Sequence, residues 1–383
     1  MARFAPEAIS QKNAGGFFSA FFILLLCVRK FLFIFLLAVM LSEVEASFSQ
    51  DTSFNVKYFK TLPHISIRAL EARSESCAWF SANHGVWGFT EDAGKHWHID
   101  SIKVDSVYPE FRSIAVLNDS TILLLSIASP AYLFKTTNKG KTWRLVYKNT
   151  DKNIFFDSMK FRDEKNGIAI GDPIDGRIQL IECYKGGEKW RKYKRDYTNE
   201  VIYESESIFA SSNSNVSLHS WYTIRFGTGG KYARLIEFSR EHDFHPRHHS
   251  YNTPITQGEK MTGIFSLDFF DDSLGVIAGG NYEKTDTSIV SLAVTYNGGK
   301  NWKVMKGTKP FFGSCVQFKS ADAFFVTGHD GTFMCNHKSG KISEIKDESG
   351  SQLKFHTLRF SPSGKTVWFA GDKGRIAFIN FAK

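Results

Sequence analysis

A motif of eight residues recurs four times in this chain and constrains its fold more than any other feature. Residues 90–97, 136–143, 183–190 and 295–302 follow the pattern Ser/Thr-x-Asp/Asn-x-Gly-x-x-Trp, although the third copy has Cys183 and Lys185 at its first and third positions. The Trp residues are 46, 47 and 112 positions apart, so the last interval indicates one degenerate copy. A period in the forties is typical of solenoids and propellers.

The chemistry of the motif is that of a tight hairpin. An Asp or Asn side chain accepts hydrogen bonds from the amides of its own turn, and Gly adopts the positive φ that other residues resist. Trp then begins the next strand and offers a large packing surface. The structural motif residues are Asp92, Gly94, Trp97, Asn138, Gly140, Trp143, Gly187, Trp190, Asn297, Gly299 and Trp302.

Strand-like segments flank every copy of the motif. One apolar segment precedes each copy, another follows it, and two more come before that pair, which predicts four antiparallel strands per repeat, as in a propeller blade. Three further repeats keep this rhythm without a good motif, at about 205–244, 313–345 and 355–381. The last lacks its outer strand, which residues 54–62 can supply. We therefore expect residues 50–383 to form one all-β domain, a seven-bladed β-propeller closed by an N-terminal strand.

The first 49 residues have the form of an export signal. The basic pair Arg29-Lys30 is followed by an apolar run at 31–41 and then by small residues at 47–49, which predicts cleavage before Gln50. A further apolar run at 17–28 is unusual, and translation from Val28 would give a signal of ordinary length. The alternative is an uncleaved anchor made of both runs, since each alone is shorter than the ~20 residues that span a bilayer.

Export predicts a periplasmic or extracellular protein, in a Gram-negative envelope. Any attachment to the membrane would then be through the N-terminal segment alone, if it stays uncleaved. The charge does not indicate nucleic acid as a partner: 48 Lys+Arg and 39 Asp+Glu give +9 for the chain, and the one dense basic stretch, 185–195, also suits a solvated outer strand.

Cysteine and histidine patterns give no metal or redox site. The chain has five Cys, too few for a disulfide scaffold, and we expect Cys77, Cys183, Cys315 and Cys335 to be buried free thiols on strands. Four His and an Asp lie within 242–249 (HDFHPRHH), but a zinc site usually draws its ligands from two fixed elements, whereas this stretch is one loop. There is no C-x-x-C and no G-x-G-x-x-G, so we expect neither metal nor cofactor.

The turns between the second and third strands of the blades should gather on one face, opposite the motif turns. We predict a mouth there that serves as the ligand or partner face. Hairpin chemistry alone explains Asp330 and Asp372, whereas the Gly-Asp-Pro-Ile-Asp-Gly turn at 171–176 is longer than a hairpin needs. The polar residues predicted at this mouth are His84, Asp172, Asp175, Tyr282, Glu283, His329, Asp330, Asp372 and Lys373.

No convincing catalytic set is present. Sialidases share the Asp-containing motif, but the nearest match to their arginine motif, at 111–114, lacks a Pro. Other glycosidases place two carboxylates across a cleft, for which Asp172 or Asp175 are the candidates.

The motif matches the Asp-box, or bacterial neuraminidase repeat. Together with the stretches at 171–176, 226–230, 262–269 and 279–282, it makes the chain resemble the exported propellers of the photosystem II stability and assembly factor family, especially their non-photosynthetic bacterial relatives. The resemblance implies a seven-bladed scaffold that holds partner proteins during assembly. Many relatives carry an "oxidoreductase" label that no motif here supports.

These observations predict a monomeric propeller that binds a protein partner in the envelope, without enzymatic activity. A carbohydrate-active enzyme acting on a glycan is the alternative, and an oxidoreductase is the second alternative.

Overall fold

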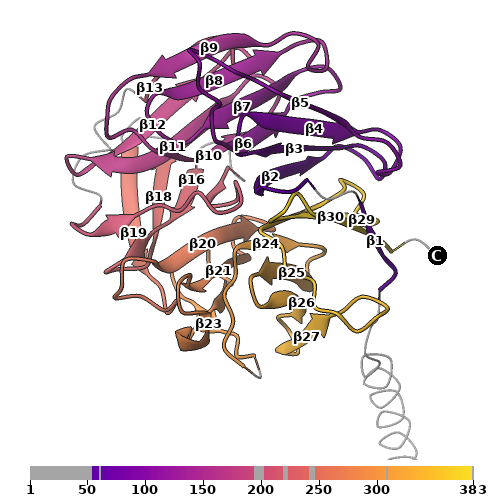
Figure 1. Cartoon of the computed structure of the whole chain (residues 1–383). Coiled ribbons are helices and arrows are strands. Elements are labelled where there is room, and N and C mark those ends of the chain that lie inside the picture. Colours follow the sequence, from indigo (N-terminus) through magenta and orange to yellow (C-terminus); the bar gives the residue numbers. More distant parts are fainter. Residues whose placement is uncertain are drawn as a thin grey trace, which may run out of the picture. The chain divides into compact units, whose positions relative to one another are not determined.

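The computed structural model describes residues 54–59, 62–193, 202–218, 223–240, 246–307 and 309–381 (Figure 1). They form seven antiparallel sheets whose first strands pack side by side around a common centre. The predicted all-β seven-bladed propeller is therefore confirmed. No helix in these ranges is both long and apolar enough to cross a membrane. The predicted signal segment, residues 1–49, lies outside the described residues.

The first three blades each have four strands in sequence order. Their bounds are β2 (Ile67–Ala72), β3 (Ala78–Ala82), β4 (Val86–Thr90) and β5 (His98–Ser101); β6 (Phe111–Val116), β7 (Ile122–Ser126), β8 (Ala131–Thr136) and β9 (Arg144–Asn149); β10 (Phe156–Phe161), β11 (Gly167–Ile174), β12 (Arg177–Cys183) and β13 (Trp190–Lys192).

Blades 4 and 5 are joined by an additional small strand pair, β14 (Glu206–Ser207) and β17 (Gly229–Gly230), which extends the sheet of blade 5 beside β20. Blade 4 comprises β15 (Val216–Ser217), β16 (Thr223–Gly227), β18 (Arg234–Arg240) and β19 (Pro246–Asn252). Blade 5 comprises β20 (Thr262–Phe269), β21 (Gly275–Asn281), β22 (Leu292–Thr295) and β23 (Lys303–Val304), with a short 3-10 helix η2 (Thr285–Thr287) between β21 and β22.

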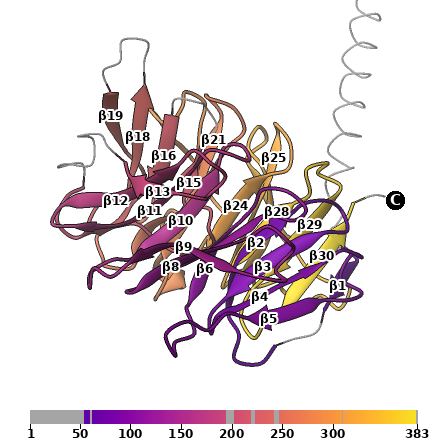
Figure 2. The same cartoon turned by 90° about the horizontal axis from the view of Figure 1, so that it is seen from above.

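The N-terminal strand closes the ring. Blade 6 comprises β24 (Cys315–Phe318), β25 (Ala323–Gly328), β26 (Gly331–Asn336) and β27 (Lys341–Ile345), and blade 7 comprises β28 (Thr357–Phe360), β29 (Thr366–Ala370) and β30 (Ile376–Asn380). The outer strand of blade 7 is β1 (Val56–Tyr58), which pairs with β30 (Figure 2). This closure, predicted for residues 54–62, covers the edge that β30 would otherwise expose.

The motif turns cap the blades and also bind neighbouring blades together. In the first copy, Asp92 Oδ1 accepts the amide of His96 at 2.9 Å, and Thr90 Oγ1 accepts the amide of Gly94 at 3.0 Å. A Cβ on Gly140 would overlap the ring of Trp87 in the preceding blade. The glycine is therefore required both by its φ of 79° and by close packing between blades.

Two local expectations were wrong. Blade 4 was predicted to end near residue 244, with the histidine stretch as a loop, but its outer strand β19 runs to Asn252 and includes His248 and His249. His242, Asp243 and His245 lie outside the described residues. Cys77 is half-buried in the turn before β3 rather than on a strand, while Cys183, Cys315 and Cys335 are buried, and all four are free.

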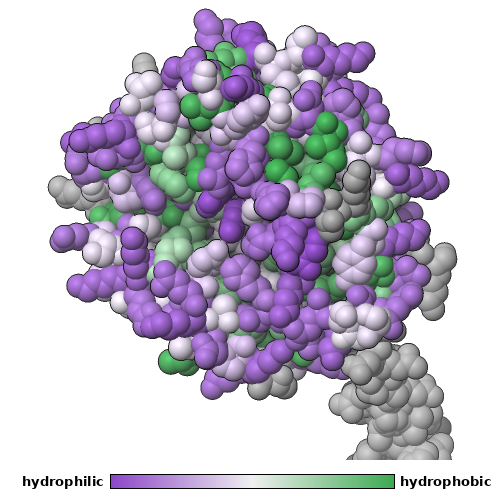
Figure 3. Space-filling view, viewed as in Figure 1, coloured by the Kyte–Doolittle hydropathy of each residue, from purple (hydrophilic) through white to green (hydrophobic). Residues whose placement is uncertain are grey.

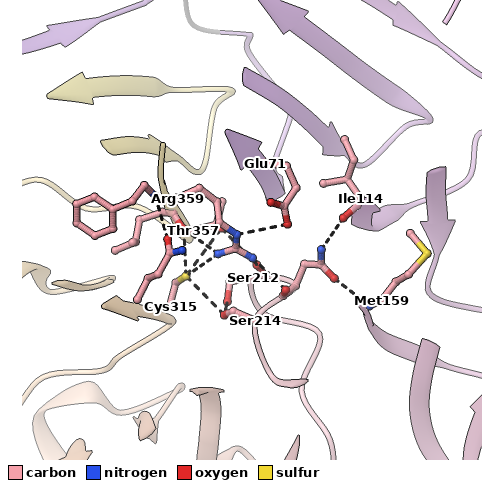
Figure 4. A network of polar contacts seen from close by, with 12 residues as sticks. Glu71, Ile114, Met159, Ser212, Ser214, Cys315, Thr357 and Arg359 are labelled. Atoms are coloured by element: carbon pink, nitrogen blue, oxygen red, sulfur yellow. Dashed lines mark hydrogen bonds and ion pairs between the residues drawn. The ribbon is translucent and has the colours of Figure 1, made fainter. Parts of the chain in front are cut away.

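A segment of blade 4 fills the channel at the centre of the ring. Before β15 the chain leaves its own sheet, and residues 212–215, here called the plug, contact other blades (Figure 4). The Asn213 side chain donates to Ile114 O at 2.8 Å in blade 2 and accepts the Met159 amide at 3.0 Å in blade 3. Arg359 of blade 7 donates to the carbonyl of Asn213 at 3.0 Å.

The plug also reaches blades 5 and 6. Ser214 Oγ lies 2.6 Å from Ser266 Oγ, and Ser212 Oγ donates to Ser314 O at 2.8 Å. Arg359, which holds the plug, is buried and lies 3.5 Å from Glu71 of blade 1. One short segment thus links the inner strands of the ring through polar contacts, where many propellers have an open channel.

Candidate functional site

A cleft of about 380 Å³ lies beside the plug, on the face of the second turns. Its floor is formed by residues 207–211, here called the strap, which connect β14 to the plug. Around the strap the cleft is lined by Arg68, Arg112, Phe155, Asp172, Lys260, Met261, Phe265 and Tyr282. The face of the molecule shown in Figure 3 is largely hydrophilic, with its hydrophobic residues in separate patches.

Register shifts in the inner strands place side chains at this cleft. The pairing of β2 with β3 is interrupted at Arg68, that of β6 with β7 at Arg112, and that of β20 with β21 at Phe265. A bulge of this kind redirects a side chain out of the regular alternation. The same position in three blades therefore contributes a lining residue.

The basic part of the cleft has excess positive charge. Arg68 donates to the hydroxyl of Tyr282 at 3.4 Å and has no carboxylate within ion-pair distance among the described residues. Arg112 pairs with Glu110 at 2.6 Å, and Lys260 is exposed without an ion pair in the described part of the chain. The two guanidinium groups and the ammonium group can donate hydrogen bonds to an anionic group of a ligand.

Another part of the cleft is aromatic. Phe209 of the strap stacks on Phe265 with ring centroids 3.9 Å apart, and Phe312 meets Phe265 edge to face at 4.7 Å. Tyr282 packs edge-on against Phe312 at 5.4 Å, and Met261 packs against this cluster. Rigid rings beside cationic groups suit a ligand with an apolar part next to an anionic one.

Two aspartates lie near the strap, Asp172 at the cleft and Asp157 fully buried behind it. Asp172 Oδ1 accepts the amide of Ile208 at 2.8 Å, and burial raises the pKa of Asp172 to about 6. Asp157, at the bulge of β10, is fully buried, and neither of its oxygens has a hydrogen-bond partner in the described residues. Burial, with the nearby Asp172 carboxylate, raises the pKa of Asp157 well above the ordinary value.

Glycines let the strap approach its neighbours. Gly229 of β17 pairs with Gly263 of β20, and a Cβ on either residue would overlap the opposing backbone. A Cβ on Gly171 would overlap the carbonyl of Phe155, and one on Gly279 the carbonyl of Gly263. Each of the four stretches that carried the family resemblance thus has a residue at or beside this cleft.

A buried ion pair fixes the start of the strap. The Arg234 guanidinium donates to both carboxylate oxygens of Glu206, at 2.9 and 2.5 Å, and Thr228 Oγ1 donates to the same carboxylate at 2.5 Å. Arg234 also lies over the ring of Tyr203 at 3.8 Å. Because the carboxylate is bonded on several sides, this pair orients β14 and the strap that follows.

The structure brings some predicted mouth residues together and leaves others apart. Asp172 and Tyr282 line the cleft. His329 packs edge-on against Tyr282, at 4.9 Å, and against His356, whose Nε2 lies 2.7 Å from Asp372 Oδ1. Asp330 is occupied structurally, since its carboxylate accepts Thr285 Oγ1 at 2.9 Å and the Phe312 amide at 2.8 Å.

The remaining predicted residues point outward. His84, Asp175 and Lys373 have positive φ at exposed turn tips, and Glu283 is exposed. Lys373 and Asp372 border a second, shallower hollow with residues 63–66 and Arg375. Turn geometry alone explains residues such as Asp and His at these positions, because both are enriched where φ is positive.

Sequence reasoning missed the basic residues and the strap. Arg68 lies within β2, Lys260 lies just before β20, and the strap has no sequence motif. Aligning the repeats on their inner strands would have shown the pattern: Arg68, Arg112 and Phe265 each directly precede a small residue, Ala69, Ser113 and Ser266.

The cleft does not match a glycosidase or a metal centre. Asp157 is the nearest acidic companion of Asp172, and its oxygens are sealed from the cleft. The Tyr282 hydroxyl contacts Arg68, and no described carboxylate bonds to it, in contrast to a sialidase nucleophile. No group of three or more His, Cys, Asp or Glu in the described ranges is arranged to hold a metal ion.

Comparisons with solved structures agree with the fold. A structure of YCF48 bound to D1 peptide superposes with a TM-score of 0.56 at 12% identity, covering 86% of this chain and 98% of that one. YCF48 from Cyanidioschyzon merolae superposes with a TM-score of 0.61 at 13% identity, covering 85% and 99%. No protein-family model and no curated protein matches the sequence. The chain is thus a seven-bladed propeller similar in structure to YCF48.

Proposed function

We propose that this chain is a binding scaffold that holds a segment of another protein in the central cleft. The observation that carries the proposal is the cleft itself, which combines cationic groups with the aromatic rings of Phe209 and Phe265. Among the described residues Arg68 has no ion pair, and Arg112 and Lys260 line the same cleft. A peptide with an acidic group next to an apolar side chain complements both parts. The similar protein YCF48 has been seen with a bound peptide, which supports a peptide as the ligand class.

The partner is proposed to lie in the cell envelope. The basic pair and apolar run within residues 1–49 support export of the chain. The relevant extract for a search is therefore the envelope fraction of the source cells.

Charge reversal in the cleft tests the proposal. The double variant Arg68→Glu, Arg112→Glu should lose at least ten-fold in captured partner from an envelope extract, because both donors become repulsive to an acidic segment. The matched control is Lys300→Glu, Lys303→Glu, which makes the same change of charge at exposed positions on the motif face. Equal capture by both variants would contradict the proposal, provided that circular dichroism shows both to be folded.

A further inference from the structure

The strap is an extended chain in which one hydrogen-bonding edge is only partly used. In β14, Ser207 pairs with Gly229, and the carbonyl of Ser205 accepts the Lys231 amide at 3.0 Å. Main-chain groups of successive residues in a strand point to opposite sides. The odd-numbered residues therefore face β17, and the even-numbered residues, including Ile208 and Ala210, face away from it. The Ile208 amide indeed points to Asp172 rather than to β17.

The side chains of successive strap residues contact different blades, which indicates that the chain stays extended beyond β14. Ile208 belongs to the apolar cluster of blades 3 and 4, whereas Phe209 stacks on Phe265 of blade 5. Ser211 Oγ lies 2.6 Å from Ser314 Oγ of blade 6, on the same side as Phe209. Alternation with a period of two is the geometry of a strand.

Two main-chain groups on the edge that faces away from β17 lack a partner. Among the described residues, the carbonyl of Ile208 and the amide of Ala210 accept or donate no hydrogen bond, and the carbonyl of Ala210 receives only a long one, 3.5 Å, from Arg112. Ile208 and Ala210 are buried, with 2% and 6% of their surface exposed, yet both line the cleft. Backbone groups in such a position normally have a partner.

We propose that the partner binds as an extended peptide that adds a strand along the strap, pairing with the Ile208 carbonyl and the Ala210 amide. Main-chain pairing supplies affinity, and alternate side chains supply selectivity. Neighbouring residues of the added strand point to opposite sides. An acidic side chain can then meet Arg68 and Arg112 while the next, apolar one meets the rings of Phe209 and Phe265. This inference rests on the proposed function, since it specifies how the same cleft holds its ligand.

The test begins with a peptide selected by display on the full chain, with the Arg68→Glu, Arg112→Glu variant as counter-selection. Each amide of that peptide is then N-methylated in turn, and the affinity is measured by titration. Strand addition predicts a loss of ten-fold or more at the amide that faces the Ile208 carbonyl, a loss allowed also at the amide two residues away that faces Ala210, and less than three-fold at the amide between them and at the others. Large losses at adjacent amides, or at none, would overturn the inference and leave the proposed function standing. Failure to select any peptide would overturn both.

Variants at Ala210 test the role of its amide in peptide binding independently. Ala210→Pro removes the amide proton that the peptide would bond and should weaken binding at least ten-fold, whereas Ala210→Gly keeps the amide and should bind within about three-fold of wild type. Hydrogen exchange on the wild type complements the variants: bound peptide should slow exchange of the Ala210 amide, and an unchanged rate would count against strand addition.

Discussion

Asp92 on the motif face and Asp172 on the cleft face both lie near hairpin turns, yet their carboxylates have opposite surroundings. Asp92 accepts the His96 amide and contacts the His96 ring, and these bonds lower its pKa to about 2. Asp172 has one amide bond and is largely buried, and burial raises its pKa to about 6. The motif face satisfies its own polar groups, whereas the cleft face leaves some of its groups in need of a partner.

The largest expected effect is on the motif face and concerns stability. Gly140→Ala forces a side chain into a φ of 79° and against Trp87 of the preceding blade, and should cost about 3–4 kcal/mol of unfolding free energy. Gly176→Ala is the control: its φ is 73°, but nothing lies within 4 Å of the added Cβ, so about 1 kcal/mol is expected. Denaturant unfolding measures both, and equal costs would show that packing between blades is not what the motif glycine provides.

The plug should come next. Asn213→Ala leaves the Ile114 carbonyl and the Met159 amide without partners in the centre of the ring, at a cost of about 2–3 kcal/mol. The exposed residue Asn301, whose amide is bonded by its own motif turn, serves as control: Asn301→Ala removes no buried bond and should cost less than about 0.5 kcal/mol. If the Asn213 variant unfolded at the same denaturant concentration as wild type, the plug would not hold the blades together.

A smaller effect is expected in how the unfolding free energy depends on pH, where Asp172 and Asp92 should act in opposite directions. Because the pKa of folded Asp172 is raised to about 6, the folded state holds this proton more tightly than the unfolded state between about pH 4 and pH 6. Stability from this group is therefore lost as pH rises through that window. Relative to wild type, the unfolding free energy of Asp172→Asn should therefore be higher at pH 7 than at pH 4 by about 2 kcal/mol.

Urea unfolding of both proteins at pH 4 and pH 7 measures this difference. Asp92→Asn serves as the opposing control, because the folded pKa of Asp92 is lowered and its contribution is lost as pH falls toward 2. Should Asp172→Asn be destabilising at pH 7 by more than at pH 4, the carboxylate would be a stabilising ion at this site and the contrast with Asp92 would fail.

The smallest expected effect concerns turn tips on the cleft face. Asp175 is exposed at a left-handed turn position outside the cleft, so Asp175→Ala should leave partner binding within about two-fold of wild type. Titration of the selected peptide gives the value. A loss of ten-fold or more would mean that the binding surface extends over the second turns and is not confined to the cleft.

The sequence predicted the scaffold better than the site, for physical reasons. Motif turns such as residues 90–97 follow local chemistry that repeats in each blade, so their spacing is visible in one sequence. The face of the site also followed from blade topology, and with it Asp172 and Tyr282. The position of Arg68 shows only as a repeated basic or aromatic residue before a small one, and its bulge depends on strand pairing. The strap was not predictable, because a segment that leaves its sheet depends on contacts distant in sequence. His84 and Lys373 were chosen from turn composition, which does not distinguish a binding residue from a turn residue.

Site-specific photocrosslinking in cells tests the central claim most directly, because it needs no knowledge of the partner. A photoreactive phenylalanine analogue replaces Met261 at the cleft in one strain and Tyr296, half-exposed on the motif face, in another. Binding in the cleft predicts a discrete crosslinked protein from position 261 and none from position 296. A crosslink from position 296 alone, or none from either, would contradict a binding scaffold that works through this cleft.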